Sequence, residues 1–187
     1  MKVLVAYATR HGSTAGIASR IAETLTAAGH EATAVPVDQV TTLDEYEAVV
    51  LGSAAYMYHW LKPAVQFARQ HHSALAERPL WLFSSGPVGS TTVDDQGRIV
   101  DEKGRDVFES SRPKDVDELA TLLHPRGDRV FFGAYDPEAD PVGFGERMLK
   151  LIPAAKDSLP AGDFRDWQAI EDWAREIAGS LTSTDED

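Results

Sequence analysis

The first fifteen residues constrain the fold more than any other part of the chain. Val3 to Ala8 is an almost uninterrupted apolar run, typical of a strand that is covered on both faces of a parallel sheet. A hydroxyl-rich turn, Thr9 to Thr14, follows it, and the apolar spacing from Ala15 onward predicts a helix. A helix N-terminus presents unpaired amides and a partial positive charge. This turn is therefore predicted to bind a phosphate or another anion.

Buried strands alternate with helices along the rest of the chain. The predicted strands cover residues 3–8, 31–37, 48–53, 79–85 and 128–135. The predicted helices cover residues 15–28, 62–75, 115–123, 145–152 and 166–181, and residues 54–60 are expected to be a loop. This alternation predicts a three-layer α/β fold with a doubly wound, five-stranded parallel sheet. A strand order of 2-1-3-4-5 brings the loops after strands one, three and four to one edge of the sheet.

The chain is expected to form a single domain over residues 1–181. Residues 93–113 carry many charges and few apolar side chains, which predicts an inserted exposed loop or small hairpin. Residues 182–187 are polar and acidic and are predicted to be a disordered tail.

Three loops supply the candidate binding residues. In the first, the hydroxyls of Thr9, Ser13 and Thr14 would hold a phosphate together with backbone amides, and Gly12 would let the backbone approach closely. The second brings three aromatic side chains that could stack on a flat ring, and the third brings small residues that could approach the edge of a ring. The candidate set is Thr9, Arg10, His11, Gly12, Ser13, Thr14, Ser53, Ala54, Ala55, Tyr56, Met57, Tyr58, Trp60, Ser84, Ser85, Gly86, Pro87, Val88 and Gly89.

Each loop also has a simpler interpretation. The hydroxyls of the first loop could be ordinary helix caps, the aromatic residues could cover the edge of the sheet or form a partner surface, and the third loop could be a plain connector. The chain has neither the G-x-G-x-x-G fingerprint of dinucleotide-binding proteins nor the G-x-x-x-x-G-K-[ST] motif of the P-loop. No residue is assigned a catalytic role, and the histidines show no metal-ligand spacing.

The composition argues against several classes of function. Acidic residues outnumber basic ones 30 to 18, for a formal charge of −12, which disfavours nucleic acid as a ligand and favours a basic protein partner. The absence of cysteine excludes disulfides and thiolate metal sites and is typical of a reducing cytoplasm. No apolar run approaches the roughly 18 residues of a membrane span.

These three loops, in this order, resemble the flavodoxin family. The resemblance rests on Thr9-Arg10-x-Gly12-x-Thr14, on Val50-Leu51-Gly52-Ser53 with aromatic residues after it, and on Ser84-Ser85-Gly86. Within that family the chain is most similar to the flavodoxin-type, oxygen-independent protoporphyrinogen dehydrogenase, through residues 148–152 and 166–178.

The resemblance implies a non-covalently bound FMN that transfers electrons. Its phosphate would lie on the first loop and its isoalloxazine between the second and third. The similar dehydrogenase oxidises a porphyrinogen and passes the electrons to a quinone. The anionic propionates of such a substrate would need cations, and the candidates are Lys62, Arg98, Lys103, Arg105, Arg112 and Lys114. This chain departs from the dehydrogenase because it lacks a basic C-terminal region and its charge of −12 would be repelled by an anionic membrane.

Three alternatives remain at this stage. The chain could be a soluble flavodoxin that carries electrons for a basic partner rather than an enzyme acting on a small molecule or quinone. A phosphoacceptor signalling domain of the same topology would need an acidic cluster at the ends of strands one and three, where Ala8-Thr9 and Gly52-Ser53 stand instead. A binding module that has lost FMN is the third.

Overall fold

The computed structural model describes residues 1–86, 92–96, 98–101, 103–136 and 161–183. A parallel sheet lies at its centre, with the strands in the order β2-β1-β3-β5-β8. The strands are β1 (Lys2–Ala8), β2 (Glu31–Pro36), β3 (Ala48–Tyr56), β5 (Leu80–Ser85) and β8 (Gly127–Phe131). The predicted order is confirmed, with β5 and β8 in the places of strands four and five.

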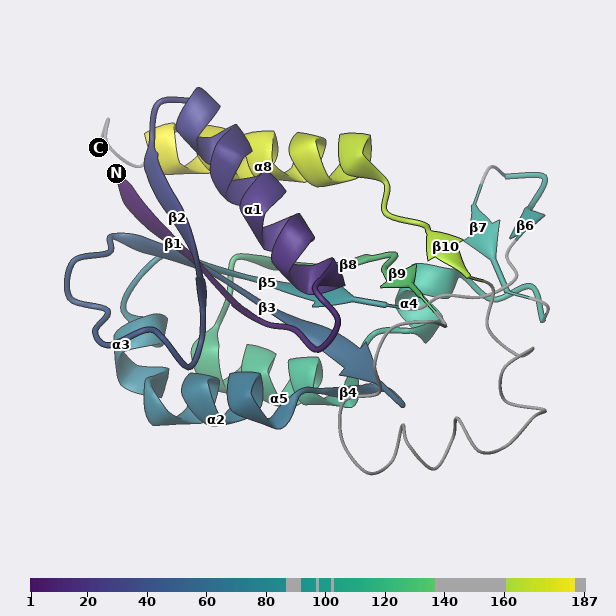
Figure 1. Cartoon of the computed structure of the whole chain (residues 1–187), viewed down its shortest axis with the longest axis horizontal. Coiled ribbons are helices and arrows are strands. Elements are labelled where there is room, and N and C mark those ends of the chain that lie inside the picture. The colour runs from purple at the N-terminus through teal and green to yellow at the C-terminus, as the bar shows by residue number, and fades with distance from the viewer. Residues whose placement is uncertain (87–91, 97, 102, 137–160, 184–187) are drawn as a thin grey trace.

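Helices cover both faces of this sheet (Figure 1). One layer is formed by α1 (Ser13–Ala27) and α8 (Trp167–Thr182), and the opposite layer by α2 (Lys62–Gln70), α3 (His72–Ala76) and α5 (Lys114–Leu123). The predicted three-layer arrangement is confirmed. Because neighbouring side chains of a strand point to opposite faces, Val3 and Val5 pack under α1 and α8 while Leu4 and Ala6 pack against the other layer.

The core on the α1 and α8 side is built around aromatic rings. Phe83 on β5 is fully buried, and its ring centroid lies 6.4 Å from that of Trp173 on α8. Phe131 on β8 lies 5.5 Å from Trp173, in an edge-to-face arrangement. These contacts hold α8 against the strands whose ends form the candidate site.

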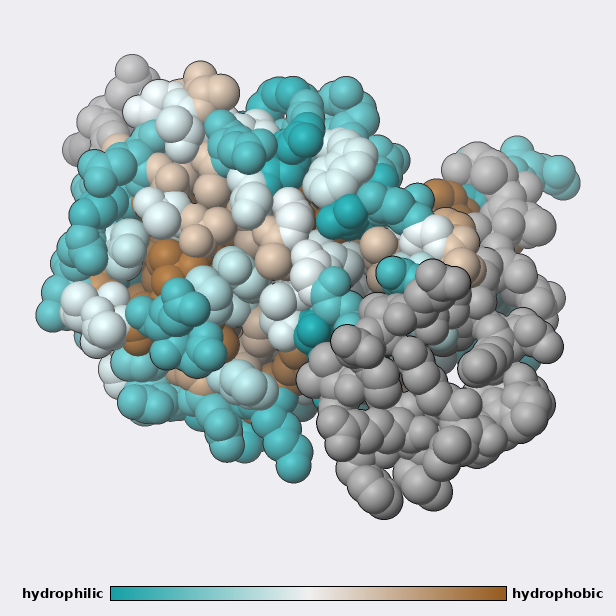
Figure 2. Space-filling view, in the orientation of Figure 1, coloured by the Kyte–Doolittle hydropathy of each residue, from teal (hydrophilic) through white to brown (hydrophobic). Residues whose placement is uncertain are grey.

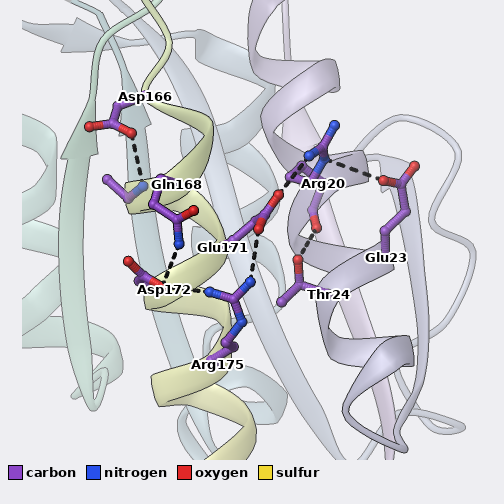
Figure 3. Close-up of polar contacts among 9 residues, drawn as sticks. Arg20, Glu23, Thr24, Asp166, Gln168, Glu171, Asp172 and Arg175 are labelled. Atoms are coloured by element: carbon purple, nitrogen blue, oxygen red, sulfur yellow. Dashed lines mark hydrogen bonds and ion pairs between the residues drawn. The ribbon is translucent and has the colours of Figure 1, made fainter.

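Ion pairs join the two helices of this layer near the surface (Figure 3). Arg20 of α1 donates a hydrogen bond of 2.7 Å to Glu171 of α8, and Arg175 donates one of 2.8 Å to the same carboxylate. These hydrogen bonds, chiefly the one from Arg20, lower the pKa of Glu171 below its usual value.

Figure 2 shows that the visible side of the molecule carries hydrophobic residues towards its middle and hydrophilic ones around much of its periphery.

Four of the predicted segments differ from the structure by more than one residue. Residues 54–60 form a hairpin rather than a loop, because β3 continues to Tyr56 and pairs antiparallel with β4 (His59–Trp60). The second helix is interrupted at His71, whose φ of −104° and ψ of 18° leave the helical conformation. Strand five ends at Phe131, and β9 (Ala134–Tyr135) pairs instead with β10 (Gly162–Asp163). α1 begins at Ser13, two residues before its predicted start.

The inserted segment is more ordered than an exposed loop. The small hairpin predicted as one possibility is confirmed by β6 (Thr92–Val93) and β7 (Ile99–Val100), which pair antiparallel, and a short unpredicted helix, α4 (Val107–Ser110), follows.

Two similar turns succeed one another in this insertion. In the first, Asp94 accepts hydrogen bonds from the backbone and side chain of Arg98, and in the second, Asp101 does the same with Arg105. The seven-residue spacing of these Asp–Arg pairs is visible in the sequence. This spacing could have predicted both turns.

Some predictions fall on residues that the structure does not describe. The helix expected over residues 145–152 lies outside the described residues, and so do residues 184–187 of the expected tail. Thr182 belongs to α8, so the helix extends into the segment predicted to be disordered. Within the described ranges, no helix combines the length and the apolar character needed to cross a membrane.

Candidate functional site

The three predicted loops meet at the carboxyl edge of the sheet. Ala8 at the end of β1 is paired in register with Ser53 of β3, and Ser53 with Ser84 of β5. A Cβ atom at Gly133 would lie 3.4 Å from the hydroxyl of Ser13 and 3.5 Å from that of Ser85. The first and third loops therefore approach each other closely beside Gly133.

The first loop is a tight turn closed by its own side chain. The Thr9 hydroxyl accepts a hydrogen bond of 3.1 Å from the amide of Gly12. Gly12 has a φ of +85°, a left-handed conformation that favours glycine. Its carbonyl then accepts the 3.0 Å hydrogen bond from Gly16 that begins α1. The turn thus delivers the chain directly into the first turn of the helix.

The first turn of α1 has the polar groups of an anion site. The first amides of any helix have no partner within it, and no side chain of the described residues caps this one. The Thr14 hydroxyl oxygen is buried, and among the described residues it has no hydrogen-bond partner. A buried hydroxyl without a partner costs about 1–3 kcal/mol. A phosphate oxygen is an acceptor that would satisfy it, so the residues present fit the phosphate group of a ligand.

Ser13 is held from outside the loop. Its hydroxyl oxygen accepts a hydrogen bond of 2.9 Å from the amide of Ala134 in β9. A hydroxyl that accepts one hydrogen bond can still donate its own proton to an anion. Ala134 lies 121 residues further along the chain, and no pattern in the sequence connects it with Ser13.

The second loop is a two-residue hairpin turn with an unfavourable backbone. Met57 has a φ of 50° and Tyr58 a φ of 63°, and side chains of both residue types disfavour this left-handed region. The Met57 side chain is 91% exposed and Tyr58 is 53% exposed. The guanidinium of Arg10 lies 4.5 Å from the ring centroid of Tyr56, so the first and second loops are in contact. Strained backbone of this kind is often found at binding sites.

Trp60 lies apart from the other two aromatic residues. It is 4% exposed, and its indole Nε1 donates a 2.8 Å hydrogen bond to the hydroxyl of Ser84. The prediction that Trp60 can stack on a flat ligand is wrong for this conformation, because its ring belongs to the core below the turn. Tyr56 and Tyr58 remain as the exposed aromatic residues of the second loop.

Ser53 in β3 and Ser84 near the end of β5 are buried and form hydrogen bonds within the protein. The Ser53 hydroxyl donates to the Ala54 carbonyl and accepts from the Leu61 amide at 3.0 Å. Ser84 accepts from Trp60, as described above. Gly86 has a φ of +127°, and its amide donates to the Phe131 carbonyl. Pro87, Val88 and Gly89 lie outside the described residues.

Asp115 supports the hairpin turn and was not among the predicted residues. Its carboxylate accepts a 2.9 Å hydrogen bond from the amide of Trp60 and lies 3.1 Å from Nδ1 of His59. The amide of Lys114 donates to the Tyr58 carbonyl at 3.0 Å. An acidic residue in the first turn of a helix is too common to have identified this contact from sequence.

Arg165 is a second residue near the first loop that was not predicted from the sequence. Its guanidinium forms a two-point ion pair with Asp163, with distances of 2.7 Å and 2.6 Å, and one of its nitrogens lies 3.4 Å from the carbonyl oxygen of Ser13. The hydrogen bond from Arg165 lowers the pKa of Asp163 below its usual value.

Comparisons with known proteins agree with this geometry. The flavodoxin domain family model matches residues 4–127. No curated protein sequence matches the chain at a significant level.

Solved structures share the fold at low sequence identity. A flavodoxin from the domain Archaea is 16% identical, with 97% of this chain and 99% of that chain covered and a TM-score of 0.56. A mutant of the flavodoxin from Pseudomonas aeruginosa is 18% identical, with the same coverage and a TM-score of 0.58. The rubredoxin oxygen:oxidoreductase from Desulfovibrio gigas is 13% identical over all of this chain but only 37% of its own, with a TM-score of 0.61.

The family match begins in β1 and ends at the first residue of β8, so it includes all three loops of the candidate site. The chain therefore belongs to the flavodoxin domain family, whose cofactor is FMN, and its first loop has the groups that the phosphate of FMN requires.

Proposed function

We propose that this chain holds FMN in the three loops at the carboxyl edge of the sheet and transfers electrons through it to a protein partner. The observation that carries the proposal is the buried Thr14 hydroxyl at the start of α1, for which the described part of the chain offers neither a hydrogen-bond partner nor a side-chain cap of the helix. When bound, a flavin accepts and releases electrons one or two at a time. The residues of this chain bind it, orient it and control access to it.

The first loop would hold the phosphate and the second would flank the ring. Amides of the first turn of α1 and the hydroxyls of Ser13 and Thr14 are the phosphate donors in this proposal. The exposed side chains of Tyr56 and Tyr58 offer faces on which a flat ring can stack. Arg10 lies against Tyr56 and would help to fix its orientation.

An electron carrier is favoured over an enzyme that oxidises a porphyrinogen. Three of the six cations considered for binding propionates are paired with carboxylates: Arg98 with Asp94, Arg105 with Asp101, and Arg112 with both Asp117 and Asp128. Their charges are largely compensated within the insertion and its surroundings. A chain with a formal charge of −12 attracts a basic redox protein over long distances.

Titration of the flavin-free protein with FMN and with riboflavin tests the cofactor site. The two ligands share the ring and differ in the phosphate. We expect FMN to bind at micromolar concentration or below, and riboflavin to bind much more weakly, as measured by quenching of flavin fluorescence. Equal affinities would contradict a phosphate site in the first loop.

Stepwise reduction of the FMN-bound protein distinguishes the two functions. A carrier is expected to accumulate a one-electron form that is visible in the absorption spectrum, and to show no turnover with protoporphyrinogen and a quinone. Rapid porphyrinogen oxidation without a one-electron form would instead support the dehydrogenase that the sequence resembles.

A further inference from the structure

The chain returns to the start of α1 after β8. There the amide of Ala134 donates to the Ser13 hydroxyl at 2.9 Å, and the amide of Phe164 donates to the Gly133 carbonyl at 3.1 Å. The two-residue strands β9 and β10 pair beside these contacts. Two segments that are distant in sequence are thereby joined to the loop that is expected to hold phosphate.

Arg165 is fixed in place on three sides. Asp163 binds it through two carboxylate oxygens, and its guanidinium carbon lies 4.3 Å from the ring centroid of Trp167 at the start of α8. The Arg165 side chain is only 17% exposed. From this position one guanidinium nitrogen reaches the carbonyl of Ser13, 3.4 Å away.

Gly16 makes room for this guanidinium. A Cβ atom at Gly16 would lie 2.4 Å from Nη1 of Arg165, which is too close for any side chain at that position unless Arg165 moves. Glycine inside a helix is normally unfavourable compared with alanine. The contact with Arg165 gives a physical reason for its presence in the first turn of α1.

We propose that Arg165 is a positioning residue for phosphate binding, which fixes the backbone of Ser13 and with it the donors of the first turn of α1. It acts through the loop rather than as the counter-charge of the phosphate, because Asp163 already neutralises it. Both Arg165 and Ala134 lie beyond residues 4–127, the stretch that the family model matches. The inference rests on the proposed FMN site.

Arg165→Met tests this role, with Arg20→Met as the matched control. The guanidinium of Arg20 lies 5.1 Å from the same Trp167 ring, and its described partners are carboxylates of α1 and α8. The readout is the ratio of the FMN and riboflavin dissociation constants. We expect Arg165→Met to reduce the preference for FMN over riboflavin by about fivefold to tenfold, the effect of losing one supporting hydrogen bond. Arg20→Met should leave this preference unchanged.

Gly16→Ala keeps the arginine and displaces it. The end of the Arg165 side chain can shift to accommodate the added methyl group, and alanine favours the helix, so the variant is expected to fold. Its preference for FMN should nevertheless fall. A preference that both variants retain, or an equal loss of affinity for the two flavins, would overturn the role of Arg165. If wild type itself shows no preference, the proposed FMN site fails and this inference falls with it.

Discussion

Replacing Thr14 by valine should move stability and cofactor affinity in opposite directions. Valine has the shape of threonine but lacks the hydroxyl, which is buried and without a partner among the described residues. In the flavin-free protein the change removes an unsatisfied polar group. In the FMN-bound protein it removes a donor to a charged phosphate.

The magnitudes follow from these two environments. Loss of an unsatisfied buried hydroxyl should stabilise the flavin-free protein by about 1–2 kcal/mol. For a chain of this size, that raises the melting temperature by about 2–8 °C. Loss of a hydrogen bond to a charged group costs about 1.5–3 kcal/mol, so the dissociation constant of FMN should rise between about tenfold and a hundredfold.

Thermal unfolding of the flavin-free protein and titration with both flavins measure these effects. Thr24→Val is the control, because this residue lies on the same helix and its hydroxyl already donates to the Arg20 carbonyl at 2.9 Å. The control should neither stabilise the protein nor weaken FMN. A destabilised Thr14→Val variant, or one that loses FMN and riboflavin affinity equally, would refute the reasoning.

Three further predictions concern the core, the helix contact and the hairpin turn. Gly52→Ala should destabilise the protein by about 1–3 kcal/mol in denaturant unfolding, because its Cβ would lie 2.0 Å from the buried ring of Phe83. Gly179→Ala in α8 is the control, since no atom of the described residues lies within 4 Å of that Cβ position. The pKa of Glu171 is lowered in the folded protein, so its carboxylate stabilises the fold above the unfolded-state pKa, and this contribution is lost as the pH falls. The free energy of unfolding of Glu171→Gln should therefore fall less steeply in acid than that of wild type. Identical pH profiles would contradict this prediction. Replacing Met57-Tyr58 by Asn-Gly should stabilise the flavin-free protein by about 1–2 kcal/mol, because both positions have a positive φ. The same change should weaken flavin binding. Unchanged stability would argue against a strained turn.

Local patterns were sufficient to predict the sheet and its order. The apolar runs of β1, β3 and β5 are buried on both faces, and each is followed by a helical pattern, so the alternation itself indicated a parallel sheet. The same reasoning placed the three loops at one edge. It failed for residues 54–60, because the hairpin there depends on Asp115 and Ser53, whose hydrogen bonds to Trp60 and Leu61 no local pattern reveals.

The candidate site was predicted by residue type but not by orientation. Thr9, Gly12 and Thr14 could be proposed from sequence because the end of a strand, a turn and the start of a helix follow one another along the chain. The burial of Trp60 could not be recognised, because an aromatic side chain beside two exposed tyrosines gives no sign of which way it points.

The sequence by itself determined that an α/β sheet exists, that its first strand leads through a hydroxyl-rich turn into a helix, and that the molecule is acidic. These properties depend on neighbours within a few residues or on simple sums. Only the tertiary structure decided that Ala134 and Arg165 contact Ser13 and that Arg165 packs against Gly16. Those contacts join segments more than a hundred residues apart, and they exist only once packing of the sheet and of α8 has brought the segments together.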